Sequence, residues 1–218
     1  MTASGEAMGL ACVWDMDDVL ISSGMAHFAA WQDLGREAGH PFTLEQHRES
    51  LGRRTPDILR LAWGITGPPD QVARWTARKE ELFRAHAAEL RPLPGAVALV
   101  RALHAAGWRQ AVGSSGPAEN VALSLAVLGV ASCFAAVVTG DDITHGKPDP
   151  EIFRIALQRL GVAPARSLVI EDAVTGVQAG KAAGAFTIGV THSRSREDLE
   201  QAGADLVIAS LWELSPPQ

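Results

Sequence analysis

The sequence predicts an α/β protein, in which a doubly wound, Rossmann-like parallel sheet carries an inserted domain made only of helices. Two observations support this fold class. From residue 93 onward, short apolar segments alternate with helical segments, which is typical of parallel strands joined by right-handed crossovers. Residues 25–89 lack any segment with the pattern of a strand. We therefore expect a core domain formed by residues 1–22 and 93–218 and a helical cap domain formed by residues 23–92.

The predicted cap helices begin at residues that are typical of helix starts. Thr43 and Gln46 fit a capping box. Thr55 and Pro56 fit an N-cap followed by a proline in the first turn. The cap helices are expected over residues 25–38, from residue 44, from residue 56 to about 64, and from residue 70 to about 89.

The core elements follow from the alternating pattern. A first strand over the apolar run that begins near residue 12 precedes the cap. The other strands are expected over residues 110–114, 136–140, 168–171, 186–190 and 206–208, and the helices over residues 97–105, 118–128, 151–160, 176–183 and 196–202.

Composition limits the classes of partner. The chain has 218 residues, 47% of them hydrophobic and 20% charged, which is ordinary for a globular protein with one core and a small second domain. A net charge of -6 gives no basic footprint for nucleic acid or an anionic membrane. The sequence lacks an apolar run long enough to span a bilayer, and its first nine residues lack the pattern of a signal peptide. We expect a cytoplasmic monomer whose partner is a small molecule.

The two cysteines give no sign of a metal site or a disulfide. Cys12 and Cys133 are expected in strands, and their spacing is not that of metal ligands. Free thiols are therefore the expectation.

Two carboxylates follow the first predicted strand. Asp15 and Asp17 are two residues apart, and side chains alternate along a strand, so both are expected on the same side of it. In such a pair, one carboxylate can act as nucleophile or metal ligand while the other transfers a proton. An acidic strand end that only caps the next helix is the alternative interpretation, and the remaining strand ends decide between the two.

Polar residues also end the other predicted strands. The second strand ends in Ser114 and Ser115 just before a helix, a combination that suits a phosphate group. Lys147 follows the third strand, and Glu171 and Asp172 end the fourth. Because ligands bind at the carboxyl ends of the strands in such sheets, we expect these groups in one site with the inserted helices as its lid. Acidic oxygens without histidine or cysteine favour Mg²⁺ shared with a phosphate, and hence phosphoryl transfer through an aspartyl phosphate.

Four sequence blocks resemble, in order, those of the haloacid dehalogenase superfamily. The similarity is to its beta-phosphoglucomutase-like and phosphoglycolate phosphatase-like members, which have a helical cap, and it spans essentially the whole chain. The blocks are residues 14–20, 112–115, 146–153 and 169–176.

The resemblance implies a role for each residue of the core site. Asp15 would be the nucleophile, and Asp17 would protonate the leaving oxygen and later activate water. Mg²⁺ would be held by Asp15, by the backbone carbonyl of Asp17 and by Asp172, with support from Glu171. Ser114 and Lys147 would bind the oxygens of the phosphoryl group.

The resemblance also implies substrate-binding residues. His27 lies where cap and core join and resembles a hinge or substrate-contacting histidine, although a histidine on a helix surface is an equal alternative. Arg53 and Arg54 lie in a segment similar to the substrate-reading loop of the family, and Lys79 resembles a cap lysine that reaches the site. Ser115 is the remaining candidate. The other six histidines lack metal spacing and are given no role: His40, His47, His86, His104, His145 and His192.

Three positions depart from the family pattern. Asp18 stands where the family usually has glycine, at a point where the backbone turns out of the strand. Aspartate tolerates left-handed geometry better than most residues but adds strain and charge. Ala173 replaces a common serine, and Ser22 stands where aspartate is frequent.

The predicted function is that of a Mg²⁺-dependent phosphatase. The expected substrates are small phosphomonoesters of the sugar phosphate or phosphoglycolate type. A sugar phosphomutase, which uses the same core residues, is the first alternative, and a non-catalytic phosphate-binding sensor is the second.

Overall fold

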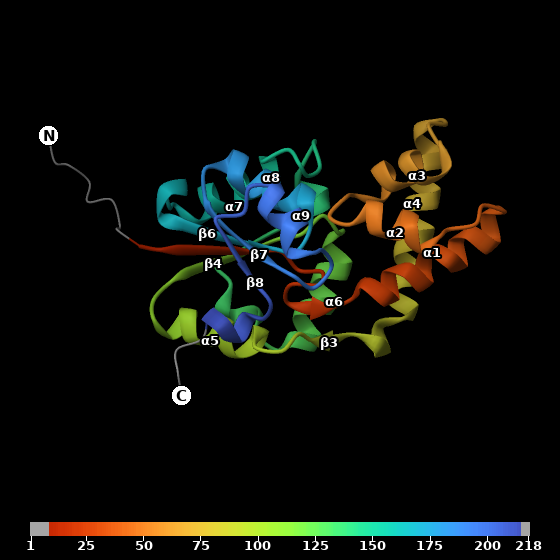
Figure 1. Ribbon diagram of the computed structural model, residues 1–218. Helices are drawn as coiled ribbons and strands as arrows, with labels where there is room; N and C mark the ends of the chain where they lie inside the picture. The colour runs from red at the N-terminus through yellow and green to blue at the C-terminus, as the bar shows by residue number, and fades with distance from the viewer. Residues whose placement is uncertain (1–8, 215–218) are drawn as a thin grey trace, which may run out of the picture.

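A six-stranded parallel sheet forms the centre of the protein (Figure 1). The computed structural model describes residues 9–214. The strand order is β5-β4-β1-β6-β7-β8, and each neighbouring pair is parallel. The expected α/β fold with a doubly wound sheet is thereby confirmed. The first strand, β1, lies between β4 and β6, so residues that follow these three strands meet at one edge of the sheet.

Apolar side chains on both faces of β1 anchor the helices that cover the sheet. Cys12 and Trp14 pack into one buried cluster with residues of α5 and α6. Ala11 and Val13 point to the opposite face and pack with residues of α7 and α8. In Figure 1, α7, α8 and α9 accordingly lie on one side of the sheet, and α5 and α6 lie on the other.

The element bounds agree closely with the predicted ones in the core. The strands are β1 (Ala11–Trp14), β2 (Ile21–Ser22), β3 (Arg91–Pro92), β4 (Arg109–Gly113), β5 (Ala136–Val138), β6 (Ser167–Glu171), β7 (Phe186–Val190) and β8 (Leu206–Ile208). The α-helices are α1 (Gly24–Ala38), α2 (Leu44–Ser50), α3 (Thr55–Trp63), α4 (Pro69–Ala85), α5 (Ala96–Ala105), α6 (Ala118–Leu128), α7 (Glu151–Leu160), α8 (Val174–Ala183) and α9 (Arg196–Gln201).

Helices α1 to α4 form a separate group beyond the end of the sheet, which we call the helical cap (Figure 1). Their apolar sides share a buried cluster that includes Trp31, Leu34, Phe42, Ile58 and Leu59. The two chain connections to the core pair as a short antiparallel ribbon, β2 with β3. This ribbon was not predicted, because two-residue strands are too short to show a periodic pattern. The division into core and cap domains at residues 23 and 92 stays a prediction.

Several local expectations can be compared with the structure. The capping box of Thr43 and Gln46 is confirmed. The prediction for Thr55 was wrong, because α3 begins at Thr55 with Arg54 as its N-cap. The Thr55 hydroxyl instead donates a hydrogen bond to Glu80 on α4. Helix α4 ends at Ala85 and is followed by a short 3₁₀ turn.

The remaining expectations concern the cysteines and the membrane. Cys12 and Cys133 are both free thiols, but Cys133 lies in a 3₁₀ turn and not in a strand. None of the described helices is both long and apolar enough to cross a membrane. Residues 1–8, on which the expectation of no signal peptide mostly rests, lie outside the described residues.

Candidate active site

A buried lysine joins two carboxylates at the centre of the sheet edge. Asp15 follows β1, Glu171 is the last residue of β6, and Lys147 lies in the loop between β5 and α7. The Nζ atom of Lys147 lies 2.5 Å from Oδ1 of Asp15 and 2.6 Å from Oε1 of Glu171. Nζ also donates to the backbone carbonyl of Gly113 at 3.3 Å. Burial penalises charges that are not paired, and the three converging segments supply the pairing here.

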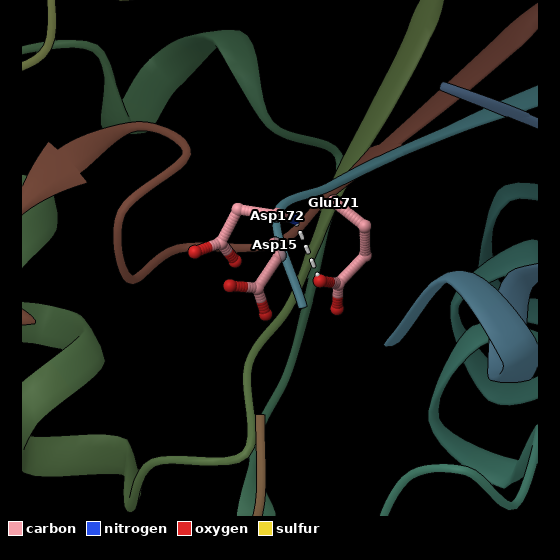
Figure 2. Close-up of side chains that lie close together, drawn as sticks. All are labelled: Asp15, Glu171 and Asp172. Carbon is pink, nitrogen blue, oxygen red and sulfur yellow. Dashed lines mark hydrogen bonds between the residues drawn. The ribbon is translucent and has the colours of Figure 1, made fainter. Parts of the chain in front are cut away.

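Three carboxylates point toward one another beside this lysine (Figure 2). One oxygen from each of Asp15, Glu171 and Asp172 lies within 4.8 Å of the others. Burial, followed by the charges of Glu171 and Asp18, raises the pKa of Asp172 well above its usual value. Burial also raises the pKa of Asp15, although Lys147 opposes this shift. With all three groups ionised the cluster would carry more negative charge than Lys147 neutralises, and its donor set of carboxylate oxygens fits Mg²⁺.

Glu171 is fixed in place by the backbone around it. Its Oε2 accepts hydrogen bonds from the backbone N–H groups of Asp172 and Ala173, at 3.0 and 3.1 Å. Helix α8 passes so close that a Cβ atom on Gly176 would lie 1.9 Å from the carboxyl group. Glycine is therefore required at position 176 for Glu171 to occupy this site.

Asp17 points away from the acidic cluster and toward the cap. Its Oδ1 accepts hydrogen bonds from the Ser23 hydroxyl at 2.6 Å and from Nε2 of His27 at 3.2 Å. Burial would raise the pKa of Asp17, but the hydrogen bonds from His27 and Ser23 and the charge of Lys79 hold it below its usual value. Asp17 is therefore ionised at neutral pH in this arrangement, and its side chain is not part of the three-carboxylate cluster.

A buried cap lysine extends the chain of contacts from Asp17. The Nζ atom of Lys79 donates a hydrogen bond to Nδ1 of His27 at 2.8 Å. Because an ammonium group can only donate, Nδ1 of His27 is the acceptor and Nε2 carries the proton that faces Asp17. The His27 ring stacks on Phe83 with 3.9 Å between the ring centroids. The structure thus joins Lys79, His27 and Asp17 through consecutive hydrogen bonds.

The two serines after β4 face different neighbours. Ser114 is buried, and its hydroxyl accepts a hydrogen bond from the backbone N–H of Gly116 at 3.1 Å. Ser115 lines the cavity described below, and its hydroxyl donates to the backbone carbonyl of Gly52 in the cap at 2.9 Å. A second such contact runs from the Thr175 hydroxyl to the carbonyl of Leu51, at 3.3 Å. Core hydroxyl groups therefore hold the cap loop against the sheet edge.

The two cap arginines also differ in their placement. Arg53 lines the cavity, and its Nε donates to the carbonyl of Glu49 at 3.3 Å. Arg54 does not line it. The Arg54 guanidinium instead contacts Asp57 at 3.3 Å and the backbone carbonyl of Ile143 in the core at 3.4 Å. A substrate contact by either arginine stays a prediction.

Asp18 has a structural role that the resemblance did not imply. Its φ of 55° lies in the left-handed region, as expected from the position at which the backbone turns out of the strand. Oδ1 of Asp18 accepts hydrogen bonds from the backbone N–H groups of Ser23 and Gly24, both at 3.0 Å, at the start of α1. Oδ2 accepts a hydrogen bond from Ser193 at 3.2 Å. Asp18 thus satisfies N–H groups at the first turn of the first cap helix.

A cavity separates these core groups from the cap. Its volume is about 80 Å³. The core contributes Asp15, Asp17 and Asp172, together with Asp18, Ser115 and Gly116. The cap contributes polar and apolar groups: His27, Trp31, His47, Ser50, Arg53, Thr55, Ile58, Lys79 and Glu80.

Glu80, Asn120 and His47 were not predicted from the sequence as residues of the site. Glu80 is buried in the cap beside Lys79, with 3.2 Å between the charged atoms. The Asn120 amide, on core helix α6, donates to Glu80 at 2.6 Å. A sequence signal for Glu80 exists, since it directly follows the candidate Lys79. Nothing in the sequence distinguishes His47, which lines the cavity, from the other histidines.

Comparisons with known proteins agree with this geometry. A family model described as haloacid dehalogenase-like hydrolase matches residues 10–184. A phosphorylated carbohydrates phosphatase of Thermotoga maritima is 32% identical over 89% of this chain and 91% of its own length. A beta-phosphoglucomutase of Bacillus subtilis is 28% identical over 94% of this chain and 91% of its own length. The crystal structure of a hydrolase from Pseudomonas syringae has the same fold, with a TM-score of 0.87, 24% identity and coverage of 94% and 95% of the two chains.

Proposed function

The chain belongs to the haloacid dehalogenase-like hydrolase family, and from this premise we propose that it is a Mg²⁺-dependent phosphatase of small phosphomonoesters. The observation that carries the proposal is the position of Asp15. Its carboxylate lies at the floor of a small-molecule cavity, 2.5 Å from a buried lysine and next to two further carboxylates. A nucleophile, a cation for the phosphoryl oxygens and a set of metal ligands are thus within reach of one bound phosphate.

In the first step, a carboxylate oxygen of Asp15 attacks phosphorus and the bond from phosphorus to the ester oxygen breaks. Asp17 is ionised in the free site, so it first takes up one proton, from solvent or from the monoanion of the ester, and then delivers this proton to the departing oxygen as the alcohol leaves. Asp17 is suited to this role because it lines the same cavity and is hydrogen-bonded to His27, whose Nε2 carries a proton. The product is an aspartyl phosphate on Asp15.

In the second step, a water molecule attacks the phosphorus of the aspartyl phosphate. Asp17 accepts a proton from this water, the acyl phosphate bond breaks, and inorganic phosphate leaves with the Asp15 carboxylate restored. Lys147 and Ser114 lie beside Asp15 at the carboxyl end of the sheet and are proposed to bind the phosphoryl oxygens.

Mg²⁺ is proposed to be held by Asp15 and Asp172, with the backbone carbonyl of Asp17 as a third ligand and Glu171 in support. When bound, the ion would neutralise the oxygens that gain charge during transfer. The raised pKa values of the Asp15 and Asp172 carboxyls support this assignment, because a cation would stabilise their ionised forms.

The proposed substrates are sugar phosphates, with phosphoglycolate as the smaller possibility. Cap residues line one side of the cavity, which suits a small ester better than a long polymer. The name of the Thermotoga relative, a phosphorylated carbohydrates phosphatase, supports the sugar class. His27, Lys79, Arg53 and Ser115 line the cavity and are the proposed substrate contacts. A contact by Arg54, which does not line the cavity, stays a prediction from the resemblance. A cytoplasmic monomer stays our expectation for the protein as a whole.

The test is phosphate release by the purified protein from a panel of hexose, hexitol, glycolate and nucleotide phosphates, with Mg²⁺ and with EDTA. We expect turnover of at least one sugar or polyol phosphate with Mg²⁺ and none with EDTA. Absence of phosphate release from every ester in the presence of Mg²⁺ would contradict the proposal and favour the phosphate-binding sensor.

A sugar phosphomutase is a second candidate, because a beta-phosphoglucomutase matches nearly the whole chain, cap included. The mutase would use the same Asp15 and would return the phosphoryl group to the sugar instead of to water. Incubation with a hexose 1-phosphate and a hexose bisphosphate primer distinguishes the two. Formation of hexose 6-phosphate without free phosphate identifies the mutase, and free phosphate identifies the phosphatase.

A further inference from the structure

One histidine that lines the cavity from the cap side has a ring that forms no hydrogen bond with the described residues. His47 lies on helix α2, lines the cavity, and is only 9% exposed. Its Nδ1 is sealed from solvent and has no hydrogen-bond partner among the described residues. The ring packs against Phe28 with 5.3 Å between the ring centroids, which fixes its orientation. The sealed Nδ1 is out of reach of a ligand, whereas Nε2 is not sealed and has no hydrogen-bond partner among the described residues.

The chemistry of the imidazole narrows what it can bind. Burial, with the charge of Lys79, lowers the pKa of His47 to about 4, so the ring is neutral near pH 7. With Nδ1 sealed, a neutral ring has one hydrogen-bonding nitrogen left, Nε2, which a hydroxyl group can complement as donor or acceptor, whereas a phosphate is better matched by cations. His47 lines the cavity, so Nε2 is the ring nitrogen available for a contact with a bound ester.

The neighbours of His47 in the cavity favour the same kind of ligand. Trp31 and Ile58 give the cap wall apolar surface, and Lys79 and Glu80 are already paired with each other at 3.2 Å. The acidic residues at the floor lie on the core side, where the phosphate is proposed to bind. His47 is thus a neutral hydrogen-bonding group in the part of the wall that would face the organic part of the ester.

We infer that His47 determines specificity by hydrogen-bonding, through Nε2, a hydroxyl group of the leaving alcohol, and so favours polyhydroxylated phosphate esters over esters without hydroxyl groups. The inference rests on the proposed function, since it assigns a contact within the same cavity. It adds His47 to the proposed substrate contacts. It also explains why an ester with a sugar-like leaving group would be preferred. A site that hydrogen-bonds a substrate hydroxyl discriminates strongly against analogues that lack it.

The first experiment compares kcat/KM for a hexose phosphate and for phenyl phosphate in wild type, His47→Leu and His47→Gln. We expect His47→Leu to lower the ratio of the two values about five- to tenfold, mainly through KM for the hexose phosphate. His47→Gln, which keeps a donor and an acceptor, should restore most of the ratio. The matched control is His104→Leu, at an exposed position on core helix α5, which should leave the ratio unchanged.

An unchanged ratio in His47→Leu, or an equal loss on both esters, would overturn the inference. Calorimetry gives a readout that needs no turnover. In an Asp15→Asn background, His47→Leu should weaken binding of hexose phosphate about five- to tenfold relative to phenyl phosphate. If His47→Leu weakened the binding of both ligands equally in this background, the inference would also be overturned. Failure of the proposed function has a different signature, because wild type would then release phosphate from neither ester whatever residue 47 is.

Discussion

The ammonium of Lys147 lies 2.5 Å from a carboxylate oxygen of Asp15 and 2.6 Å from one of Glu171, with all three groups buried. Removing one partner of a buried ion pair leaves an uncompensated charge, which typically costs about 3–5 kcal/mol. We expect Lys147→Met to lower the free energy of unfolding by roughly that amount at pH 7. Turnover should fall about a thousandfold or more, because the cation for the phosphoryl oxygens is lost.

Urea unfolding and phosphate release measure these two effects. Lys181→Met is the matched control, because Lys181 forms a partly exposed pair with Asp205 on the outer edge of the core. This control should lose less than about 1 kcal/mol and keep its turnover. A Lys147→Met protein that retains wild-type turnover would contradict the role of Lys147.

Asp18 provides a test of a structural role. Asp18→Gly relieves the left-handed backbone strain but removes the acceptor for the N–H groups of Ser23 and Gly24. We expect a net loss of about 1 kcal/mol in the free energy of unfolding, with turnover retained. Asp18→Asn keeps an acceptor oxygen and should stay closer to wild type. A collapse of turnover in both variants, at unchanged stability, would show a catalytic role for Asp18 that this account lacks.

Glu80 links stability to pH. Burial would raise its pKa, but Lys79, His27 and the Thr55 hydroxyl hold it below the usual value. A carboxyl whose folded-state pKa is lowered contributes stability that is present above its unfolded pKa of about 4.3 and is lost as pH falls through the folded pKa. Glu80→Gln should therefore be less stable than wild type at pH 6, and the difference should shrink as pH falls to about 3.5.

Urea unfolding at a series of pH values measures this difference. Glu81→Gln is the control, since Glu81 is largely exposed and pairs with Arg78 within the same helix. Its difference from wild type should be small at every pH. A Glu80→Gln difference that stays constant from pH 6 to pH 3.5 would refute the electrostatic explanation.

Mg²⁺ binding can be followed without substrate. The ion binds only the folded protein in this account, so added Mg²⁺ should raise the thermal unfolding temperature of wild type. Asp172→Asn should abolish most of that increase. The same variant should be more stable than wild type in EDTA, because Asp172 is buried among Asp15, Asp18 and Glu171. If Mg²⁺ raised the thermal unfolding temperature equally in wild type and in Asp172→Asn, Asp172 would be excluded as a ligand.

Much of the core could be predicted from the sequence because its signals are local. Strands β7 and β8 and helices α6 and α7 match the expected bounds. Both strands are short apolar segments, and each of the two helices has a proline before it and a glycine after it. The acidic and basic residues at the sheet edge were predictable because parallel strands bring their carboxyl ends to one edge of the sheet. Asp15, Lys147 and Glu171 meet there as expected.

The cap residues that line the cavity were less predictable, because their contacts join residues far apart in the sequence. Thr55 was predicted as an N-cap, but its hydroxyl finds the Glu80 carboxylate on another helix. Asn120 reaches the same carboxylate from the core, a partner 40 residues away that no local pattern reveals. The sequence around His47 contains no motif that distinguishes it from the other histidines. Only its burial at the cavity does so. Tertiary packing thus decides which polar cap residues face the site.

The central claim is that Asp15 is the nucleophile of a Mg²⁺-dependent phosphatase. Phosphate release from a sugar phosphate, measured side by side for wild type and Asp15→Asn with saturating Mg²⁺, tests it most directly. We predict steady turnover by wild type and a loss of at least about a thousandfold in Asp15→Asn, with the variant still folded by circular dichroism and still able to bind the ester. Turnover by Asp15→Asn within tenfold of wild type would contradict the claim.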